Sequence, residues 1–515
     1  MLCNENLKIN KILSILFISL PFFISSNQIH NINDIIILPL KIFQIPDHKY
    51  QIEKSKDPLS LLINKIISNN LYLDLKINHE IECPGYLTFN SPYNYFGRDS
   101  CIELHNNIEY IINSTTEKLS GINLFLNEYQ NFYYSKENIT MPTINKSKDK
   151  FVIEDMGLIF PKDNQRKMKC LILGLNPNLI NKTNENRNIK LLNLPLNIKG
   201  NKHKNFKLYL TFFYNYFLKN NKIKINDIEQ HLQSNEKSEL LIIGEAPHII
   251  YPNIFRRKNY KEIDNHYMTK DDYNYYYKSS EQNPWSIKID TIYFNNVKEG
   301  IKNYIGIFSI DYTPFLFPME LFNDYVNIYI KFYIEKRICY RKGRPLSRKY
   351  THSLHDDKRQ TFIFIYCEKN KIENLTEFYD SIPSLKFHND LLNKTFEFSG
   401  KELLYEEDEY IFLMIMPDLF KNVKITLGKI FMEKYLFTFN YDNNSIGFYD
   451  YEFKNIETNN IFINNFFFIF YKTFIFIIVF GVIVVLINIS NKKIQKLDIN
   501  KDKNNEDAEE ELIDI

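Results

Sequence analysis

Glycine is scarce in this chain, and neither sign of charge is in excess. Only 14 of the 515 residues are glycine, less than half of the ~7% in an average protein. Turns that need a positive φ therefore require other residues, above all asparagine. The 64 basic and 62 acidic residues leave a formal net charge of +2, which does not favour nucleic-acid binding through bulk charge.

Familiar catalytic and metal-binding motifs are also missing. The sequence has no G-x-S-x-G, no H-E-x-x-H and no P-loop, so three common routes to hydrolysis or phosphate chemistry are excluded. The cysteines form no C-x-x-C pair and no cluster with histidine. We therefore expect no metal site and no cofactor.

Hydrophobic residues are plentiful, at 44%, and aromatic residues reach 15%, which excludes a wholly disordered chain. From Leu71 onward, short runs rich in Ile, Phe and Tyr recur between Asn, Asp, Pro and Gly. The run at 71–77 alternates as a strand does, and 320–337 is the best helical stretch. Residues 251–284 are interpreted as an exposed loop rather than a basic, aromatic nucleic-acid patch. The pattern predicts a mostly β protein with a few short helices.

An apolar run near the start predicts a targeting segment. Residues 12–26 are apolar, follow Lys8 and Lys11, and end in small residues. This is typical of a secretory signal peptide over 1–26, with an uncleaved anchor or a buried strand as alternatives.

A second apolar run predicts a membrane helix over 466–489, which is long enough to cross a bilayer. Three lysines follow it, as expected for a cytosolic end, and the tail 490–515 is acidic. We therefore predict a single-pass type I protein of the secretory pathway or plasma membrane, its body luminal or extracellular. A buried core strand is the alternative for this run.

Cysteines and glycosylation sequons fit that compartment. Beyond Cys3, an odd number of cysteines remains for disulfides, namely Cys83, Cys101, Cys170, Cys339 and Cys367. Seven N-x-S/T sequons in the predicted luminal part predict a glycoprotein; they lie at Asn113, Asn138, Asn145, Asn181, Asn374, Asn393 and Asn443.

The stretch ITLGKIFMEKYLFTFNYDNNSIGFY, residues 425–449, resembles the C-terminal hallmark of pepsin-like aspartic proteases. The matching positions are Leu427, Gly428, Phe431, Tyr435, Phe439, Asn443, Ile446, Gly447 and Phe448. Asn440 stands where the family usually has Asp. Further blocks at 171–177, 284–294 and 382–387 resemble other family strands in the family's order.

The resemblance implies a bilobal pepsin-like fold over about 71–455. It places an N-terminal lobe at 71–245, a C-terminal lobe at 246–456 and a propeptide-like segment at 27–70. It also implies a disulfide between Cys339 and Cys367 in the C-terminal lobe.

The family hydrolyses peptides with two aspartates, one in each lobe, that share a proton and hold a water. In the first expected loop, Asn90 replaces the catalytic Asp, Ser91 the Thr and Pro92 the Gly. No Asp or Glu lies between Glu82 and Asp99. Asparagine cannot act as a general base.

In the second expected loop, spacing to Pro318 puts Ser309 at the catalytic position. A shift of two residues would instead make Asp311 the catalytic Asp, with Thr313 close behind it. Tyr129 is the candidate for the family's flap tyrosine, although Gln130 replaces the usual glycine. An ordinary strand tyrosine fits Tyr129 equally well. Ser91, Thr313 and Tyr129 are the candidate substrate-binding residues.

Three functions follow from these substitutions. The first is a catalytically inactive pseudoprotease, monomeric, that binds a peptide or protein in the cleft between the lobes. The second is an active, divergent aspartic endopeptidase that uses Asp311. The third is a structural or adhesive surface protein that uses the fold as a scaffold.

Overall fold

The computed structural model describes the chain in segments. These are residues 35–42, 59, 63, 66, 71–79, 81–89, 94–97, 117–122, 130–145, 148–161, 170–177, 193–202, 206–214, 218, 238–266, 284–299, 304–345, 361–418, 424–450, 481–483, 485–490 and 492. Within them the protein is mostly β with short helices, which confirms the predicted class.

Among the described residues, ten strands precede residue 250. They are β1 (Ile36–Ile42), β2 (Leu71–Ile77), β3 (Ile81–Thr88), β4 (Tyr95–Gly97), β5 (Glu117–Ile122), β6 (Gln130–Asn145), β7 (Lys148–Pro161), β8 (Cys170–Gly174), β9 (Tyr209–Phe213) and β10 (Ser238–Gly244).

The remaining strands follow residue 259. They are β11 (Tyr260–Asp264), β12 (Ser286–Ile289), β13 (Thr291–Phe294), β14 (Val297–Glu299), β15 (Tyr304–Phe308), β16 (Phe315–Pro318), β17 (Cys339–Pro345), β18 (Thr361–Glu368), β19 (Leu385–Asn389), β20 (Lys394–Phe398), β21 (Leu404–Glu407), β22 (Tyr410–Leu413), β23 (Ile415–Asp418), β24 (Lys424–Leu427), β25 (Phe437–Asn440) and β26 (Ser445–Tyr449).

The helices are short. They are α4 (Leu194–Gly200), α7 (Pro247–Ile250), α8 (Met319–Tyr325), α9 (Lys331–Glu335), α10 (Leu375–Ser381) and α11 (Lys429–Lys434), with 3₁₀ turns η2 (Arg257–Asn259), η6 (Lys369–Lys371) and η7 (Lys401–Leu403) and a π-helical turn η4 (Val326–Ile330). α8, η4 and α9 run on without a break, which confirms the helix predicted at 320–337.

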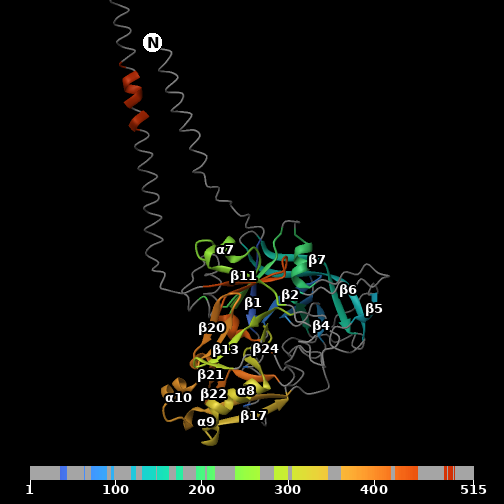
Figure 1. Cartoon of the computed structure of the whole chain (residues 1–515). Helices are drawn as coiled ribbons and strands as arrows, with labels where there is room; N and C mark the ends of the chain where they lie inside the picture. The colour runs from blue at the N-terminus through green and yellow to red at the C-terminus, as the bar shows by residue number, and fades with distance from the viewer. Residues whose placement is uncertain are drawn as a thin grey trace, which may run out of the picture. The chain divides into compact units, whose positions relative to one another are not determined.

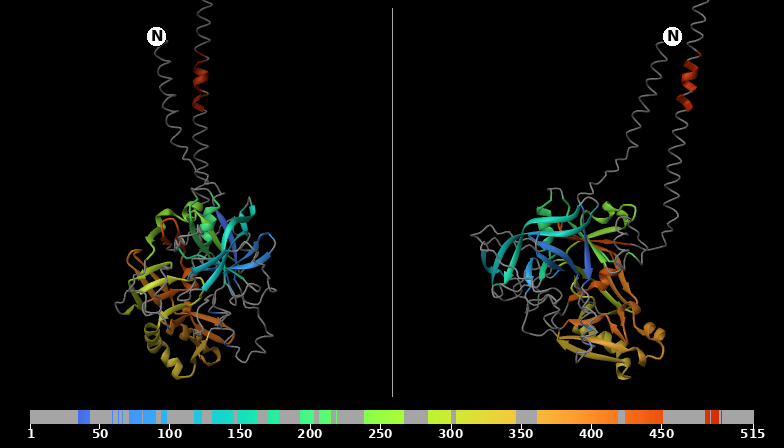
Figure 2. Two further views of the ribbon diagram at one scale, coloured as in Figure 1. Left: turned by 90° about the vertical axis from the view of Figure 1, so that its right-hand side faces the viewer. Right: turned by 180° about the vertical axis from the view of Figure 1, so that it is seen from behind.

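A sheet of thirteen strands organises the body. Its order is β11-β26-β25-β9-β10-β1-β2-β3-β8-β4-β7-β6-β5. The last strands of the body, β25 and β26, therefore lie beside strands from its first half. In Figures 1 and 2 the blue-to-cyan strands and the yellow-to-orange strands occupy two regions that this sheet connects.

The sequence patterns missed several strands, and β11 and β1 show two different reasons. β11 lies within the segment interpreted as an exposed loop, but it pairs with β26 along its whole length. Its alternate residues are charged and exposed, so it lacks the continuous apolar run of the other strands. β1 lies within the propeptide-like segment 27–70, where no strand was predicted.

Asparagine takes the place of glycine in turns, as the scarcity of glycine predicts. Several non-glycine residues with a positive φ, between 46° and 67°, are asparagines at hairpin turns. They are Asn78, Asn295, Asn296, Asn393 and Asn444.

Residues 451–515 form a separate compact unit. Of the predicted membrane helix 466–489, the structure describes 481–483 and 485–489, which are helical and exposed. The signal-peptide region 1–26 and the tail beyond Lys492 lie outside the described residues. No helix among the described residues is long and apolar enough to span a bilayer.

A five-strand arrangement occurs twice in the body. β2, β3, β8, β4 and β7 are neighbours in that order within the large sheet, and β12, β15, β24, β16 and β23 repeat it as a sheet of their own. The strand directions also repeat, because β3 and β15 run parallel to β8 and β24, whereas β4 and β16 run antiparallel to them. We name these units the N-terminal repeat and the C-terminal repeat.

Candidate functional site

The paired strands align the two repeats residue by residue. In the N-terminal repeat Gly85 pairs with Leu171 of the LILG strand, and in the C-terminal repeat Gly306 pairs with Ile425 of the ITLG strand. Both glycines are needed for close packing. A Cβ on Gly85 would lie 2.2 Å from Leu75 Cδ1, and one on Gly306 would lie 2.8 Å from Leu427 Cδ1.

The same register runs through the loops that follow. Thr88 pairs with Gly174 and Tyr95 with Ile172. In the C-terminal repeat, Ser309 continues the strand after Phe308, and Leu316 pairs with Thr426. Both loops, 88–95 and 309–316, therefore have the same length, and Thr88 and Ser309 are equivalent.

Counting two residues onward makes Asn90 the sequence counterpart of Asp311. The register therefore makes Asp311, and not Ser309, the counterpart of Asn90, which agrees with the alternative alignment of the second loop. The alignment anchored on Pro318 pointed to Ser309 because residue spacing alone does not show which residues of neighbouring strands pair.

Asp311 is the one acidic residue of the two loops, and it is only 8% exposed. The Thr88 hydroxyl, from the other repeat, donates a hydrogen bond to its Oδ2 at 3.0 Å. The Ser309 hydroxyl lies 3.4 Å from the same oxygen and accepts the Asp311 backbone N–H at 3.2 Å. Two equivalent hydroxyls therefore converge on one carboxyl oxygen.

Burial raises the pKa of Asp311 to about 7, because a carboxylate loses its hydration inside the body. The hydrogen bonds from Thr88 and Ser309 oppose that shift, since they favour the charged form. Near neutral pH this group can therefore give up or accept a proton.

Phe439 of β25 packs beneath both loops. Its ring centroid lies 4.9 Å from that of Phe89 and 5.3 Å from that of Phe308. Phe89 follows Thr88 and Phe308 precedes Ser309, so a single buried ring supports both loops. Phe439 belongs to the stretch that carries the family resemblance.

The backbone after Asp311 is fixed by the start of α11. A Cβ on Gly428 would lie only 2.2 Å from the Pro314 carbonyl oxygen, so no larger residue fits there. Because the strand and the loop approach so closely, the Lys429 N–H donates to the Tyr312 carbonyl at 2.8 Å and the Ile430 N–H to that of Thr313 at 3.1 Å. The N–H groups of the first helical turn, which have no partner within the helix, thus hold the Asp311 loop.

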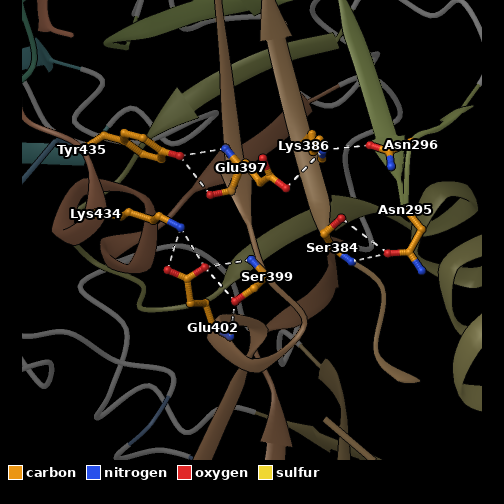
Figure 3. A network of polar contacts seen from close by, with 9 residues as sticks. All are labelled: Asn295, Asn296, Ser384, Lys386, Glu397, Ser399, Glu402, Lys434 and Tyr435. Atoms are coloured by element: carbon orange, nitrogen blue, oxygen red, sulfur yellow. Dashed lines mark hydrogen bonds and ion pairs between the residues drawn. The ribbon is translucent and has the colours of Figure 1, made fainter. Parts of the chain in front are cut away.

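The other end of α11 is tied to β20 and its turn (Figure 3). The Tyr435 hydroxyl accepts the Glu397 N–H at 2.7 Å and donates to its carbonyl at 2.9 Å. Lys434 forms an ion pair with Glu402 at 2.6 Å, and the Glu402 carboxylate also accepts the Ser399 N–H. α11 is therefore anchored at both ends.

The other predicted site residues divide into two groups. Thr313 is half-buried in the loop after Asp311. Asn90, Ser91 and Tyr129 lie outside the described residues. Thr88 was missed, because it lies 223 residues from Asp311 and only the pairing of the two repeats brings them together.

Cys339 and Cys367 form a disulfide between β17 and β18, the pairing that the resemblance implies. Cys83 is a free, buried thiol among the described residues. Burial raises its pKa to about 12, so it is a poor nucleophile.

No protein-family model matches this sequence, and no curated protein matches it significantly. Among solved structures, the chain is similar to basic 7S globulin from soybean, with a TM-score of 0.47 and 11% identity over 81% of this chain and 94% of that chain. It is also similar to conglutin gamma, a basic 7S globulin from lupine seeds, with a TM-score of 0.47 and 10% identity over 81% and 95% of the two chains. Both are distant similarities of fold.

Proposed function

We propose that this chain is a pepsin-like protein that binds a peptide or protein segment between its two repeats and does not hydrolyse it. The observation that carries the proposal is the single carboxyl group of Asp311 between two equivalent loops. The sequence counterpart of Asp311 is Asn90, an amide.

The chemistry explains why one carboxyl group is not enough. Peptide hydrolysis by a carboxyl pair needs one group to take a proton from water while the other gives one to the substrate. With its pKa near 7, Asp311 is a proton donor at acid pH and a base above neutrality. At no pH does it fill both roles, whereas its buried hydroxyl and carboxyl groups can still bind a peptide backbone.

The proposal also covers the compartment and the membrane anchoring of the chain, which are argued from the sequence. Residues 1–26 direct the chain into the secretory pathway, 466–489 anchor it, and 490–515 face the cytosol. The body is then luminal or extracellular, glycosylated at its sequons and monomeric. These statements rest on the apolar runs, the lysines beyond residue 491 and the sequons.

A second function has an observation in its favour. Asp311 is buried, and its pKa lies close to neutrality, which is typical of a catalytic acid or base. In this alternative the chain is a divergent endopeptidase in which Asp311 acts with a helper group that is not a carboxylate.

The test combines cleavage and binding in the full chain. A denatured protein is incubated with wild type, Asp311→Asn and Asp290→Asn from about pH 3 to about pH 8. Asp290 is the matched control because it lies outside the two loops, directly before β13, where it is bonded to Lys288 and the Asp390 N–H. The proposal expects no cleavage by any of the three. Cleavage that disappears only in Asp311→Asn would establish the endopeptidase instead.

Binding is measured by capture of an immobilised library of extended peptides. We expect wild type and Asp290→Asn to retain peptides and Thr88→Tyr to lose at least about tenfold in affinity, because the larger ring fills the space beside Asp311. Equal capture by all three, or none by wild type, would contradict binding between the repeats. If peptide capture is lost only in variants of exposed residues, such as Leu391→Ala, the adhesive alternative is favoured.

A further inference from the structure

β1 is an internal strand of the large sheet, although it lies in the segment 27–70. It pairs with β10 from Ile36 opposite Ile243 to Lys41 opposite Ser238. Its other edge meets β2, where Lys41 and Ile42 lie opposite Tyr72 and Leu71. Loss of β1 would therefore leave backbone groups of β10 and of the end of β2 without partners.

Both faces of β1 are covered. Leu38 and Leu40 are fully buried on one face, and Ile37 on the other is 8% exposed. Such continuous burial is typical of a strand in the interior of a body rather than of a segment laid on its surface. Lys41, at the exposed end, forms an ion pair with Asp74 of β2.

A second anchor lies further along the same segment. Leu59, Ile63 and Ile66 are helical, and their spacing puts them on one helix face. They pack into an apolar cluster of the C-terminal half that includes Leu316 and contacts Tyr312, the residue after Asp311. The other members of the cluster are Phe364, Phe412, Met414 and Met416.

No replacement for β1 is evident in the sequence. Residues 43–58 read FQIPDHKYQIEKSKDP and contain no apolar run like IILPLKI. Only the four residues 67–70 separate the second anchor from β2. A cut at 67–70 would leave no chain to take the place of β1.

We propose that β1 and the second anchor, formed by Leu59, Ile63 and Ile66, are permanent parts of the folded body and stay bound when the chain is cut. This is independent of the proposed function, since it concerns how the body is held together and not what binds beside Asp311. It predicts that the segment does not leave as a removable propeptide.

The test uses two full-length variants with an inserted protease recognition sequence, one after Lys54 and one after Asn69. The first cut separates β1 from the second anchor, and the second cut separates both anchors from β2. After digestion, native size-exclusion chromatography and mass spectrometry show whether the N-terminal piece stays with the body. We expect co-elution in both variants and release only in denaturant.

Two substitutions in the cut chain keep the outcome decisive. In the chain cut after Lys54, Leu38→Ala should raise the released fraction at least about tenfold, since a buried leucine is lost. Leu391→Ala is the control, because Leu391 is 71% exposed, and it should change nothing. If the piece is released in Leu38→Ala, unfolding of the remaining body would also support the proposal. A released piece and a body with unchanged circular dichroism would overturn it.

Discussion

The N-terminal repeat and the C-terminal repeat share strand order, register and loop length, but they differ in the side chains that their loops carry. The 88–95 loop contributes a hydroxyl, Thr88, and has an amide, Asn90, at the position of Asp311. The 309–316 loop contributes Ser309 and the carboxyl group of Asp311. The scaffold is thus symmetric, whereas the ionisable chemistry is on one side only.

This difference shows which features the fold itself requires. Gly85 and Gly306 persist at equivalent positions because a side chain there would meet a leucine of a paired strand. Thr88 and Ser309 both remain small hydroxyl residues beside Asp311. The acid is dispensable to the scaffold, because only chemistry needs a carboxyl group in both loops.

The largest expected effect is on the contact that holds the Asp311 loop. Gly428→Ala would place a Cβ 2.2 Å from the Pro314 carbonyl oxygen. We expect a loss of about 4 kcal/mol in the free energy of unfolding, or failure to fold. Chemical denaturation measures it. Gly200→Ala is the control, because nothing lies within 4 Å of a Cβ there; equal stability of the two variants would contradict the close approach.

Removal of the carboxyl group should change how stability depends on pH. The folded state raises the pKa of Asp311 from 3.8 to about 7, so it keeps a proton that the unfolded chain has lost between these values. Stability contributed by this group is therefore present below about pH 4 and falls as pH rises to about 7, by about 4 kcal/mol in all.

Asp311→Asn should abolish that fall. The variant should match wild type near pH 4 and exceed it in stability near pH 8. The matched variant Asp290→Asn should behave in the opposite way. Burial of Asp290 is outweighed by the Asp390 N–H and Lys288, so its pKa is lowered and its carboxylate stabilises the fold above about pH 4. Parallel curves of unfolding free energy against pH for wild type and Asp311→Asn would contradict a raised pKa at Asp311.

The smallest expected effect is the difference between removing the Thr88 hydroxyl and removing the Ser309 hydroxyl. Thr88→Val keeps the shape of the side chain but removes the 3.0 Å hydrogen bond to Asp311, so the pKa of Asp311 should rise further and stability near pH 8 should fall by about 1 kcal/mol. Ser309→Ala removes a longer contact of 3.4 Å and should raise that pKa less. Denaturation at several pH values measures both, and a reversed order would contradict the geometry.

Much of the fold could be predicted from local patterns. The Ile- and Phe-rich runs predicted about half of the described strands, and the apolar spacing predicted the helix through α8, η4 and α9. β11 was missed because its exposed edge residues are charged, and β1 was missed because its neighbours in the sheet are distant in sequence. Local patterns do not record such long-range pairing.

The site was harder to predict than the fold. Asp311 was identified as a candidate, but spacing along one loop could not choose between it and Ser309. That choice depends on which residues of β15 and β24 lie opposite each other. The role of Thr88 depends on contact between the repeats, which no motif in either loop encodes.

The most direct test of the two-repeat register is a carboxyl group placed at the counterpart of Asp311. The measurement is the pH dependence of the unfolding free energy of Asn90→Asp, wild type and the double variant Asn90→Asp/Asp311→Asn. If residues 90 and 311 face each other, two close carboxyl groups must share a proton. Asn90→Asp should then lose at least about 1 kcal/mol more than wild type between about pH 4 and about pH 8, and Asp311→Asn should remove that extra loss. Curves for Asn90→Asp that run parallel to wild type would contradict the equivalence of the two loops.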